Sequence, residues 1–261
     1  MKEWRVPALK PFPPYAPGGL DLEIDWEGNP WIALQRRPGA IKFDKRTEQM
    51  IVYMTPNGRG GVGFLAMSPN TKMVWMGTNG IDMTKNHITK TWRSPTRGYG
   101  LNATSKGNLL FLSLFNSEIG ELDTETGKTA VYPLPTPGAG ARRGFVDKDD
   151  RLWFAEYFGG RIAMFDTNTK QFKEWSIDVP YADPYAAVKD RNGIVWAGGM
   201  VTDYIYRLDP ATGQIKKYLL PTLNSNMRRI DVDNSTSPVS VWVGENHHAR
   251  LARIEVLDGP K

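Results

Sequence analysis

The chain has 261 residues, of which 40% are hydrophobic, and it carries a formal net charge of +5. It has no cysteine, which excludes disulfides, thiolate zinc sites and cysteine nucleophiles. No apolar run is long enough for a transmembrane helix, and no signal-peptide segment follows Met1. The modest positive charge mildly favours anionic partners.

Bulky aromatic residues recur along the chain at a nearly regular interval. The spacings are 44, 36, 42, 43 and 46 residues, and the residues are Trp31, Trp75, Phe111, Trp153, Trp196 and Trp242. A period of about 40–45 residues is typical of propeller blades. The sequence therefore predicts an all-β fold, a six-bladed β-propeller that forms one domain over residues 1–261. We interpret the repeated aromatic residues as packing between neighbouring blades.

The predicted strands begin with an unpaired segment, Glu3–Pro7. In the second repeat, we expect a tight turn at Asn86-His87 in place of the Asp-x-x-Thr turn of other repeats. The fifth repeat is the clearest, and its strands are expected at Tyr185–Val188, Ile194–Ala197, Ile205–Leu208 and Ile215–Leu220. The last repeat stops after a third strand, Leu251–Val256. We therefore expect Glu3–Pro7 to complete that blade and close the ring.

Arginines are concentrated in the connections on one face of the predicted propeller. Eleven of the 17 lie there: Arg36, Arg37, Arg59, Arg93, Arg97, Arg142, Arg143, Arg161, Arg228, Arg229 and Arg250. Arg97, Arg142, Arg143, Arg228 and Arg229 precede or open first strands, which line a propeller channel. Because arginine grips carboxylates with two hydrogen bonds, we expect an anion-binding channel mouth. The alternative is a ring of ion pairs with acidic residues on the same face.

Candidate catalytic groups gather after the last aromatic residue of the repeat. His247 and His248 are possible general bases near neutral pH, and Glu245 precedes them. Glu156 occupies the matching place in the fourth repeat. Glu156 and Glu245 are therefore candidate ligands for a divalent cation, Mg or Ca. Three tyrosines are expected to supply aromatic walls to the site, namely Tyr99, Tyr157 and Tyr185.

Two long units of the sequence resemble a known family. One runs over 152–166 and contains Trp153 and Glu156, and the other runs over 195–221 and contains Asp209-Pro210-Ala211-Thr212-Gly213. They resemble repeats of the virginiamycin B lyase family, the streptogramin lyases, and the resemblance covers nearly the whole chain. It implies a propeller, although family members of that type form seven blades and the spacing here predicts six.

The resemblance also implies an elimination reaction that opens a cyclic peptide ester with a magnesium ion. The family relies on a Glu-Pro-His-Gly-Ile-like stretch before the last Trp, an earlier channel His, and a Glu after that Trp. Here Arg228 replaces the first His, and Tyr185 stands at the position of the earlier one. Asn246 aligns with the Glu, and Glu245 lies one residue before it. Because the catalytic set is not intact, we do not expect streptogramin lyase activity.

Three functions stay open at this point. The first is a propeller that binds an anionic ligand, such as a carboxylated sugar, an aromatic acid or a polysaccharide, with possible lyase-type chemistry. The second is a non-catalytic recognition module of a secreted or multidomain protein. The third is a metal-dependent, lactonase-like hydrolase that would use Glu156, Asn102 and Asp203. We expect a secreted or periplasmic monomer that binds neither nucleic acid nor membrane.

Overall fold

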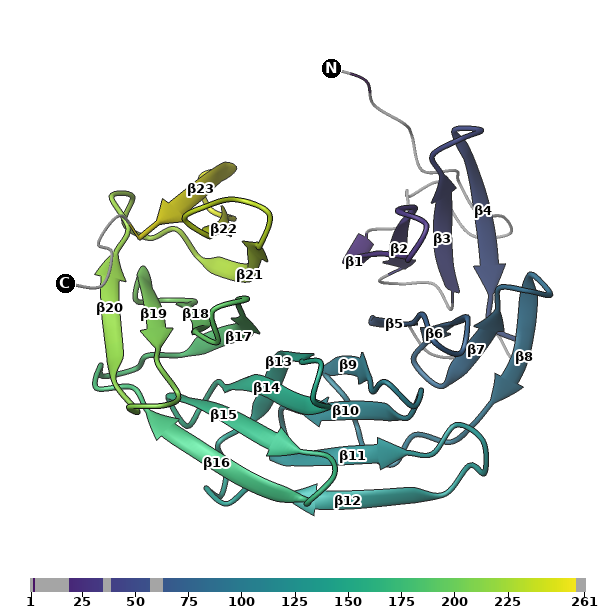
Figure 1. The fold of residues 1–261 in the computed structure, drawn as a ribbon, viewed down its shortest axis with the longest axis horizontal. Coiled ribbons are helices and arrows are strands. Elements are labelled where there is room, and N and C mark those ends of the chain that lie inside the picture. Colours follow the sequence, from purple (N-terminus) through teal and green to yellow (C-terminus); the bar gives the residue numbers. More distant parts are fainter. Residues whose placement is uncertain (1, 3–18, 35–38, 57–62, 257–261) are drawn as a thin grey trace. The chain divides into compact units, whose positions relative to one another are not determined.

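A computed structural model of the chain describes residues 2, 19–34, 39–56 and 63–256 (Figure 1). The regular secondary structure of this part consists of β-strands. They form six sheets arranged as a six-bladed β-propeller, which confirms the predicted fold class. Within each sheet the strands follow one another in chain order. The described residues contain no helix that could cross a membrane.

The chain divides into two compact units, and the first comprises Met1–Pro95, Leu101–Leu110 and Glu121–Ala130. This unit holds the first two sheets. The first sheet consists of β1 (Gly19–Ile24), β2 (Pro30–Leu34), β3 (Gly39–Asp44) and β4 (Gln49–Met54). The second consists of β5 (Leu65–Ser68), β6 (Met73–Met76), β7 (Asn79–Asp82) and β8 (His87–Thr91).

The third sheet contributes residues to both units. Its strands are β9 (Gly100–Ala103), β10 (Leu109–Ser113), β11 (Glu118–Leu122) and β12 (Thr129–Pro133).

The second unit comprises Thr96–Gly100, Phe111–Gly120 and Val131–Lys261. Its first complete sheet consists of β13 (Ala141–Val146), β14 (Arg151–Glu156), β15 (Arg161–Asp166) and β16 (Gln171–Ser176). The next consists of β17 (Pro184–Lys189), β18 (Val195–Gly199), β19 (Tyr204–Leu208) and β20 (Ile215–Leu219). The last consists of β21 (Met227–Asp233), β22 (Ser240–Glu245) and β23 (Arg250–Glu255).

Most predictions about the repeat are confirmed by these strands. Each repeated aromatic residue lies in the second strand of its sheet, and all four predicted strands of the fifth repeat are present. The prediction for the second repeat needs correction. Its turn opens at Asp82, whose side chain accepts a hydrogen bond from the Thr84 amide, and His87 already begins β8. The predicted closing strand, Glu3–Pro7, lies outside the described residues, and the last sheet has three described strands.

The repeated tryptophans pack between neighbouring sheets, as the sequence predicts. Trp31 lies in one core cluster with Val74 and Ile81 of the second sheet. Trp153 packs with Val195 of the next sheet in the same way. Each such indole buries roughly 200 Å², which is worth roughly 5 kcal/mol of transfer free energy at about 25 cal/mol per Å². These residues therefore hold adjacent blades together.

A hydrogen bond that the sequence reasoning missed fixes three of these tryptophans. The indole N–H groups of Trp31, Trp153 and Trp196 each donate, at 2.9 Å, to an aspartate six residues earlier in the chain. The acceptors are Asp25, Asp147 and Asp190. The aspartate therefore shapes the turn between the first two strands and also orients the packing residue of the blade.

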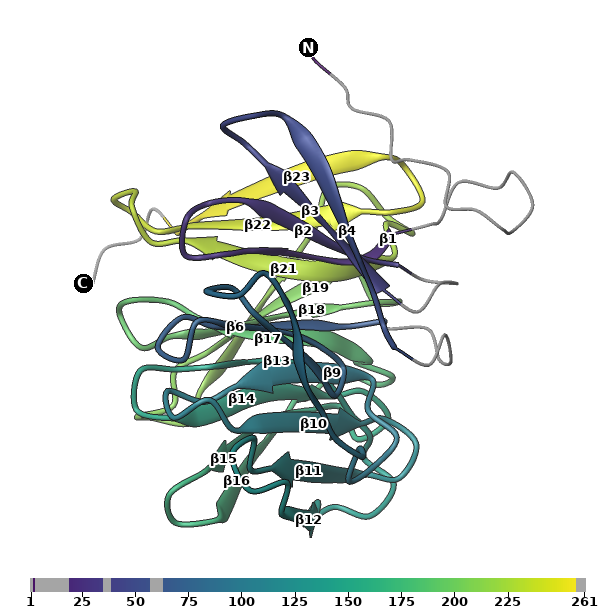
Figure 2. The same cartoon turned by 90° about the vertical axis from the view of Figure 1, so that its right-hand side faces the viewer.

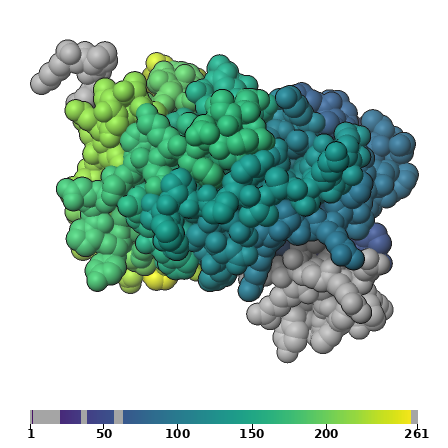
Figure 3. Space-filling model, turned by 90° about the horizontal axis from the view of Figure 1, so that it is seen from below, coloured from purple at the N-terminus to yellow at the C-terminus, as the bar shows by residue number. Residues whose placement is uncertain are grey.

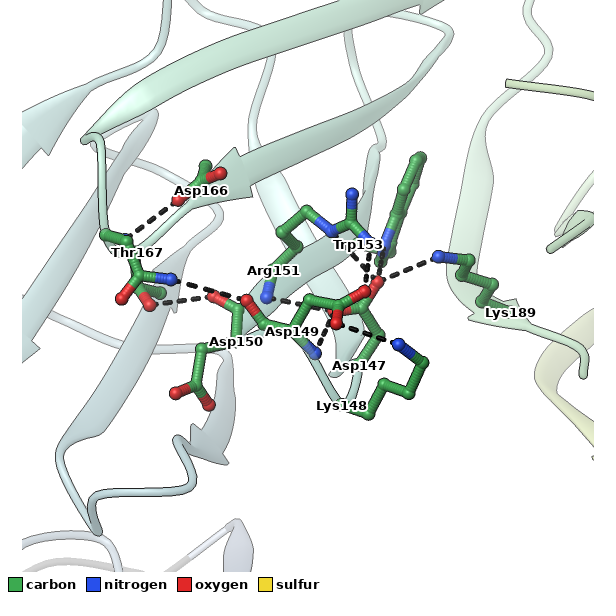
Figure 4. Close-up of polar contacts among 10 residues, drawn as sticks. Asp147, Lys148, Asp149, Asp150, Arg151, Trp153, Asp166, Thr167 and Lys189 are labelled. Atoms are coloured by element: carbon green, nitrogen blue, oxygen red, sulfur yellow. Dashed lines mark hydrogen bonds and ion pairs between the residues drawn. The ribbon is translucent and has the colours of Figure 1, made fainter. Parts of the chain in front are cut away.

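Asp147 accepts hydrogen bonds from two cationic side chains as well as from its tryptophan (Figure 4). It accepts hydrogen bonds from Lys189 Nζ at 2.8 Å and from Arg151 Nε at 3.2 Å, in addition to the Trp153 indole. Burial disfavours its ionised form, but the bonds from Lys189 and Trp153 outweigh burial and lower its pKa to about 2. This end of the sheet therefore holds a buried, fully partnered carboxylate.

The meander order of the strands separates two kinds of connection in the second unit. In Figure 2, β13 and β14 of the fourth sheet run across the view. The β13–β14 turn with Asp147 lies at one end, and the β14–β15 loop lies at the other. β16 is the outer strand of this sheet. Figure 3 shows the surface of the molecule from below the view of Figure 1, with the fourth sheet coloured teal to green.

Candidate functional site: a tyrosine–arginine cluster

The first strands of the last three sheets share a β-bulge near their beginning. The register shifts between Ala141 and Gly144 in β13, between Pro184 and Ala187 in β17, and between Met227 and Ile230 in β21. A bulge turns side chains away from the regular alternation of a strand. The first residues inside the bulges are Arg142, Tyr185 and Arg228, spaced 43 residues apart. Tyr99 lies 43 residues before Arg142, immediately before β9.

The bulge of β13 inserts Arg142 between aromatic rings. Its guanidinium carbon lies 4.0 Å from the ring centroid of Tyr157, 4.0 Å from that of Tyr185 and 5.0 Å from that of Tyr99. The Arg143 guanidinium carbon lies 5.8 Å from the Tyr99 ring and 6.0 Å from the Tyr185 ring. Such contacts stabilise a cation that is removed from water. We call these five residues the tyrosine–arginine cluster.

Arg142 carries a buried charge without a carboxylate partner among the described residues. Its exposed fraction is 8%, and its buried Nε has no hydrogen-bond partner in this part of the chain. Its one side-chain hydrogen bond goes from Nη2 to the Tyr99 hydroxyl at 3.3 Å. A buried charge normally has a paired counter-ion because desolvation is expensive. Among the described residues, this charge is therefore stabilised by tyrosine rings and one hydroxyl group.

The positive charge of Arg142 affects the pKa of Asp183, although the two side chains form no ion pair. Burial raises the pKa of Asp183, and the positive charge of Arg142 offsets only part of that rise. Partial burial thus weakens the tendency of Asp183 to act as the counter-ion of Arg142.

The hydroxyl groups of Tyr99 and Tyr185 lie 3.1 Å apart and ionise differently. Burial alone would raise the pKa of Tyr99, but hydrogen bonds from Tyr185 and Arg142, with the nearby arginine charges, lower it. Burial and the hydrogen bond to Tyr99 raise the pKa of Tyr185. The Tyr99 oxygen is therefore the more easily deprotonated of the two.

The other predicted arginines make contacts of a different kind. Arg97 is exposed, with its guanidinium carbon 5.4 Å from the Phe115 ring centroid. Arg228 is exposed and donates from Nε to the Asn226 side chain at 3.2 Å. Arg229 is exposed in β21. Three further arginines lie outside the described residues, namely Arg36, Arg37 and Arg59. The predicted arginine-rich channel mouth therefore stays a prediction.

The two candidate histidines are exposed in the loop between β22 and β23. His247 Nδ1 lies 3.1 Å from the carbonyl oxygen of Asn224, and His248 Nε2 lies 3.1 Å from that of Leu223. A carbonyl only accepts, so each of these nitrogens carries the proton that it donates. The rings are thereby tied to the loop that precedes β21. Their role as general bases stays a prediction.

The two candidate metal ligands occupy equivalent places, as expected. Glu156 ends β14, Glu245 ends β22, and both side chains are buried. Burial, reinforced by the negative charge of Glu174, raises the pKa of Glu156 to about 8. In the described residues, no three His, Asp or Glu side chains are grouped so that they could hold a metal. The Mg or Ca cofactor therefore stays a prediction.

Asp203, expected as a possible calcium ligand of a lactonase-like site, is engaged within its own loop region. Its carboxylate accepts hydrogen bonds from the backbone amides of Asn224 and Ser225 and from the Ser225 hydroxyl, at 2.6–2.8 Å. These bonds anchor the connection between β20 and β21.

The family of the chain follows from its sequence as a whole. The profile of the virginiamycin B lyase family matches residues 81–260, more than half of the chain. The chain belongs to the virginiamycin B lyase family. No curated protein matches it.

Solved structures show the same fold at low identity. Virginiamycin B lyase from Staphylococcus aureus has 20% identity and a TM-score of 0.78, and the match covers 95% of this chain and 83% of that one. A streptogramin B lyase structure has 19% identity and a TM-score of 0.75, with coverage of 93% and 84%. The extracellular domain of the putative one component system BT4673 from B. thetaiotaomicron has 16% identity and a TM-score of 0.68. That match covers 87% of this chain and 32% of the other.

Proposed function

We propose that this member of the virginiamycin B lyase family binds a carboxylate-bearing ligand at the tyrosine–arginine cluster. The observation that carries the proposal is Arg142, a cation that is 8% exposed and stacked on two tyrosine rings. No ion pair within the described residues neutralises it. A ligand carboxylate would supply the missing negative charge and accept charge-assisted hydrogen bonds.

Titration calorimetry with galacturonate and phenylacetate tests the proposal, since the two represent the sugar and aromatic classes of carboxylate. Arg142→Gln removes the charge and keeps a polar side chain. We expect it to weaken binding about 10- to 100-fold, which corresponds to about 1.5–3 kcal/mol for a charged hydrogen-bonded contact. Arg191→Gln, in the β17–β18 turn of the next sheet, is the control and leaves binding unchanged. The proposal is wrong if neither ligand binds, or if Arg142→Gln binds as the wild type does.

An elimination reaction is a second candidate function, favoured by the two hydrogen bonds that converge on the Tyr99 oxygen. In this scheme Tyr99 gives its hydroxyl proton to solvent, and the resulting phenolate takes the proton from the carbon next to the bound carboxylate. The electron pair of that C–H bond first moves into the carboxylate and gives an enolate. It then forms a double bond to the neighbouring carbon as a C–O bond there breaks. The leaving oxygen keeps its electrons and takes a proton from solvent. Arg142 stabilises the enolate that forms.

Tyr99→Phe tests this scheme because it removes the proton acceptor and keeps the ring. We expect ligand binding to persist and the formation of an unsaturated carboxylate, followed by its ultraviolet absorbance, to stop. His247→Ala and His248→Ala serve as comparisons. If they abolish turnover and Tyr99→Phe does not, the base is a histidine and Tyr99 has no catalytic role.

The chain is also proposed to act outside the cytoplasm. The support is that solved structures with this fold include extracellular domains of putative sensor systems from B. thetaiotaomicron. Cell fractionation followed by immunodetection tests the location. A signal confined to the cytoplasmic fraction would overturn it.

A further inference from the structure

Three exposed apolar side chains repeat at one position of the loops between second and third strands. Phe115, Phe158 and Val201 are each the second residue after their second strand, and they are spaced 43 residues apart. Their exposed fractions are 64%, 55% and 55%. We call these three residues the apolar rim.

The loops that carry the apolar rim share their length of four residues and the way they close. Each closes with a residue of positive φ, at Ser117 (54°), Gly160 (60°) and Asp203 (57°). The fold therefore presents the rim position in the same way in three successive repeats. These exposed side chains contribute little to the core, so their apolar area is available to another molecule.

One member of the apolar rim, Phe158, contacts the tyrosine–arginine cluster. The Phe158 ring packs edge-on against the Tyr157 ring at 5.1 Å, and the Tyr157 ring lies 4.0 Å from the Arg142 guanidinium carbon. Phe158 also covers Gly140, where an added Cβ would lie 2.6 Å from the Phe158 Cδ2 atom. One side chain, Tyr157, thus separates the exposed Phe158 ring from the buried charge.

We propose that the ligand is an aromatic carboxylate, with its carboxylate at Arg142 and its ring system against Phe158 and the apolar rim. This inference rests on the carboxylate-binding function proposed above and selects between its two ligand classes. Phe115, Phe158 and Val201 have no side-chain hydrogen-bonding atoms, so they offer nothing to the hydroxyl groups of a carboxylated sugar. They are suited to a ligand with an apolar body, which binds by losing water from both surfaces.

The test measures affinities of the wild-type chain for naphthylacetate, naphthalenemethanol and galacturonate by calorimetry. Naphthalenemethanol keeps the aromatic body and lacks the charge, whereas galacturonate keeps the charge and lacks the aromatic body. We expect naphthylacetate to bind at least about 10-fold more tightly than either of the others. Phe158→Ser should weaken naphthylacetate about 10-fold and leave galacturonate unchanged. Leu219→Ser, at an equally exposed leucine on the outer strand β20, is the control and alters neither.

The outcomes separate this inference from the function on which it rests. If galacturonate binds as tightly as naphthylacetate, or if Phe158→Ser has no effect, the aromatic assignment is wrong and carboxylate binding stands. If no carboxylate binds, the proposed function fails first. Size-exclusion chromatography provides a further arm. A wild-type dimer that Phe158→Ser dissociates, with unchanged ligand affinity, would assign the rim to a second copy of the chain and overturn the inference.

Discussion

The two ends of strand β13 carry opposite kinds of buried charge. At one end, Asp147 is partnered by Trp153, Arg151 and Lys189, and the aspartate–tryptophan bond recurs in two other sheets. Near the other end, Arg142 is stacked on tyrosine rings and lacks a carboxylate partner in the described chain. The backbone bulge recurs there, but the side chains do not. The aspartate–tryptophan bond recurs with its partners and serves the fold. At the Arg142 end only the backbone bulge recurs, and this is where we propose that a ligand binds.

Asp147→Asn gives the largest expected loss of stability among the substitutions, because it removes the buried carboxylate that Trp153, Arg151 and Lys189 share. It leaves the Lys189 ammonium and the Trp153 indole without their anionic acceptor in a buried site. We expect the free energy of unfolding to fall by about 3 kcal/mol, measured by urea denaturation. Asp149→Asn, an exposed position in the same turn, is the control and should change stability little.

The same contrast predicts a loss of stability in acid. The folded-state pKa of Asp147 is about 2, against an ordinary value of 3.8. Its stabilisation is therefore fully present above about pH 4 and is lost as the pH falls toward 2. The Asp147→Asn variant should lack this contribution. An acid denaturation curve that is the same for variant and wild type would show that Asp147 is not the responsible group.

Gly140→Ala tests how tightly Phe158 packs against the backbone just before β13. Gly140 has φ +74°, and a Cβ there would lie 2.6 Å from Phe158 and 2.8 Å from the Leu114 carbonyl oxygen. Gly138→Ala is a matched control, since Gly138 has φ +71° and no atom within 4 Å of the added Cβ. We expect losses of about 2 kcal/mol for Gly140→Ala and about 1 kcal/mol for Gly138→Ala in thermal unfolding. Equal losses would contradict the contact with Phe158.

Glu156→Gln tests a buried carboxyl group at the Arg142 end of the same sheet. Its folded-state pKa of about 8 exceeds the ordinary 4.5. Folding therefore retains a proton between these values, and stability should fall as the pH rises through this window, by up to about 1.4 kcal/mol per pH unit. The Gln variant should remove the slope. Glu125→Gln, at an exposed turn, should keep it.

Arg142→Met gives the smallest expected change in stability. Replacing a buried cation that has no counter-ion by an apolar side chain of similar length is nearly neutral. We expect the free energy of unfolding to change by less than about 1 kcal/mol, while carboxylate binding is lost. A loss as large as that of Asp147→Asn would make Arg142 a structural residue and remove the contrast between the two ends.

The fold was predictable because its signal is local and repeated. One bulky aromatic residue in each second strand, and turns that open with Asp, are visible in the sequence and match the strands observed. The aspartate–tryptophan bond has an equally simple signal in the sequence, an Asp six residues before the Trp. The closing strand Glu3–Pro7 lies outside the described residues and stays a prediction.

The site was predictable in composition and not in arrangement. Residue types and positions in the sequence indicated Arg142, Tyr99, Tyr157 and Tyr185 as site residues. The packing of Arg142 on the tyrosine rings depends on a register shift in β13, which periodicity does not reveal. The 43-residue spacing of Tyr99, Arg142 and Tyr185 is the signal that would have aligned them. The exposure of His247 and its bond to the loop before β21 depend on loop geometry, which no pattern in the sequence specifies.

A crystal structure of the chain with naphthylacetate tests most directly whether Arg142 binds a carboxylate. We expect a carboxylate oxygen within hydrogen-bond distance of the Arg142 guanidinium and the naphthyl ring against Phe158. A ligand that binds with its carboxylate away from Arg142, or a protein carboxylate that pairs with Arg142 in the complex, would contradict it.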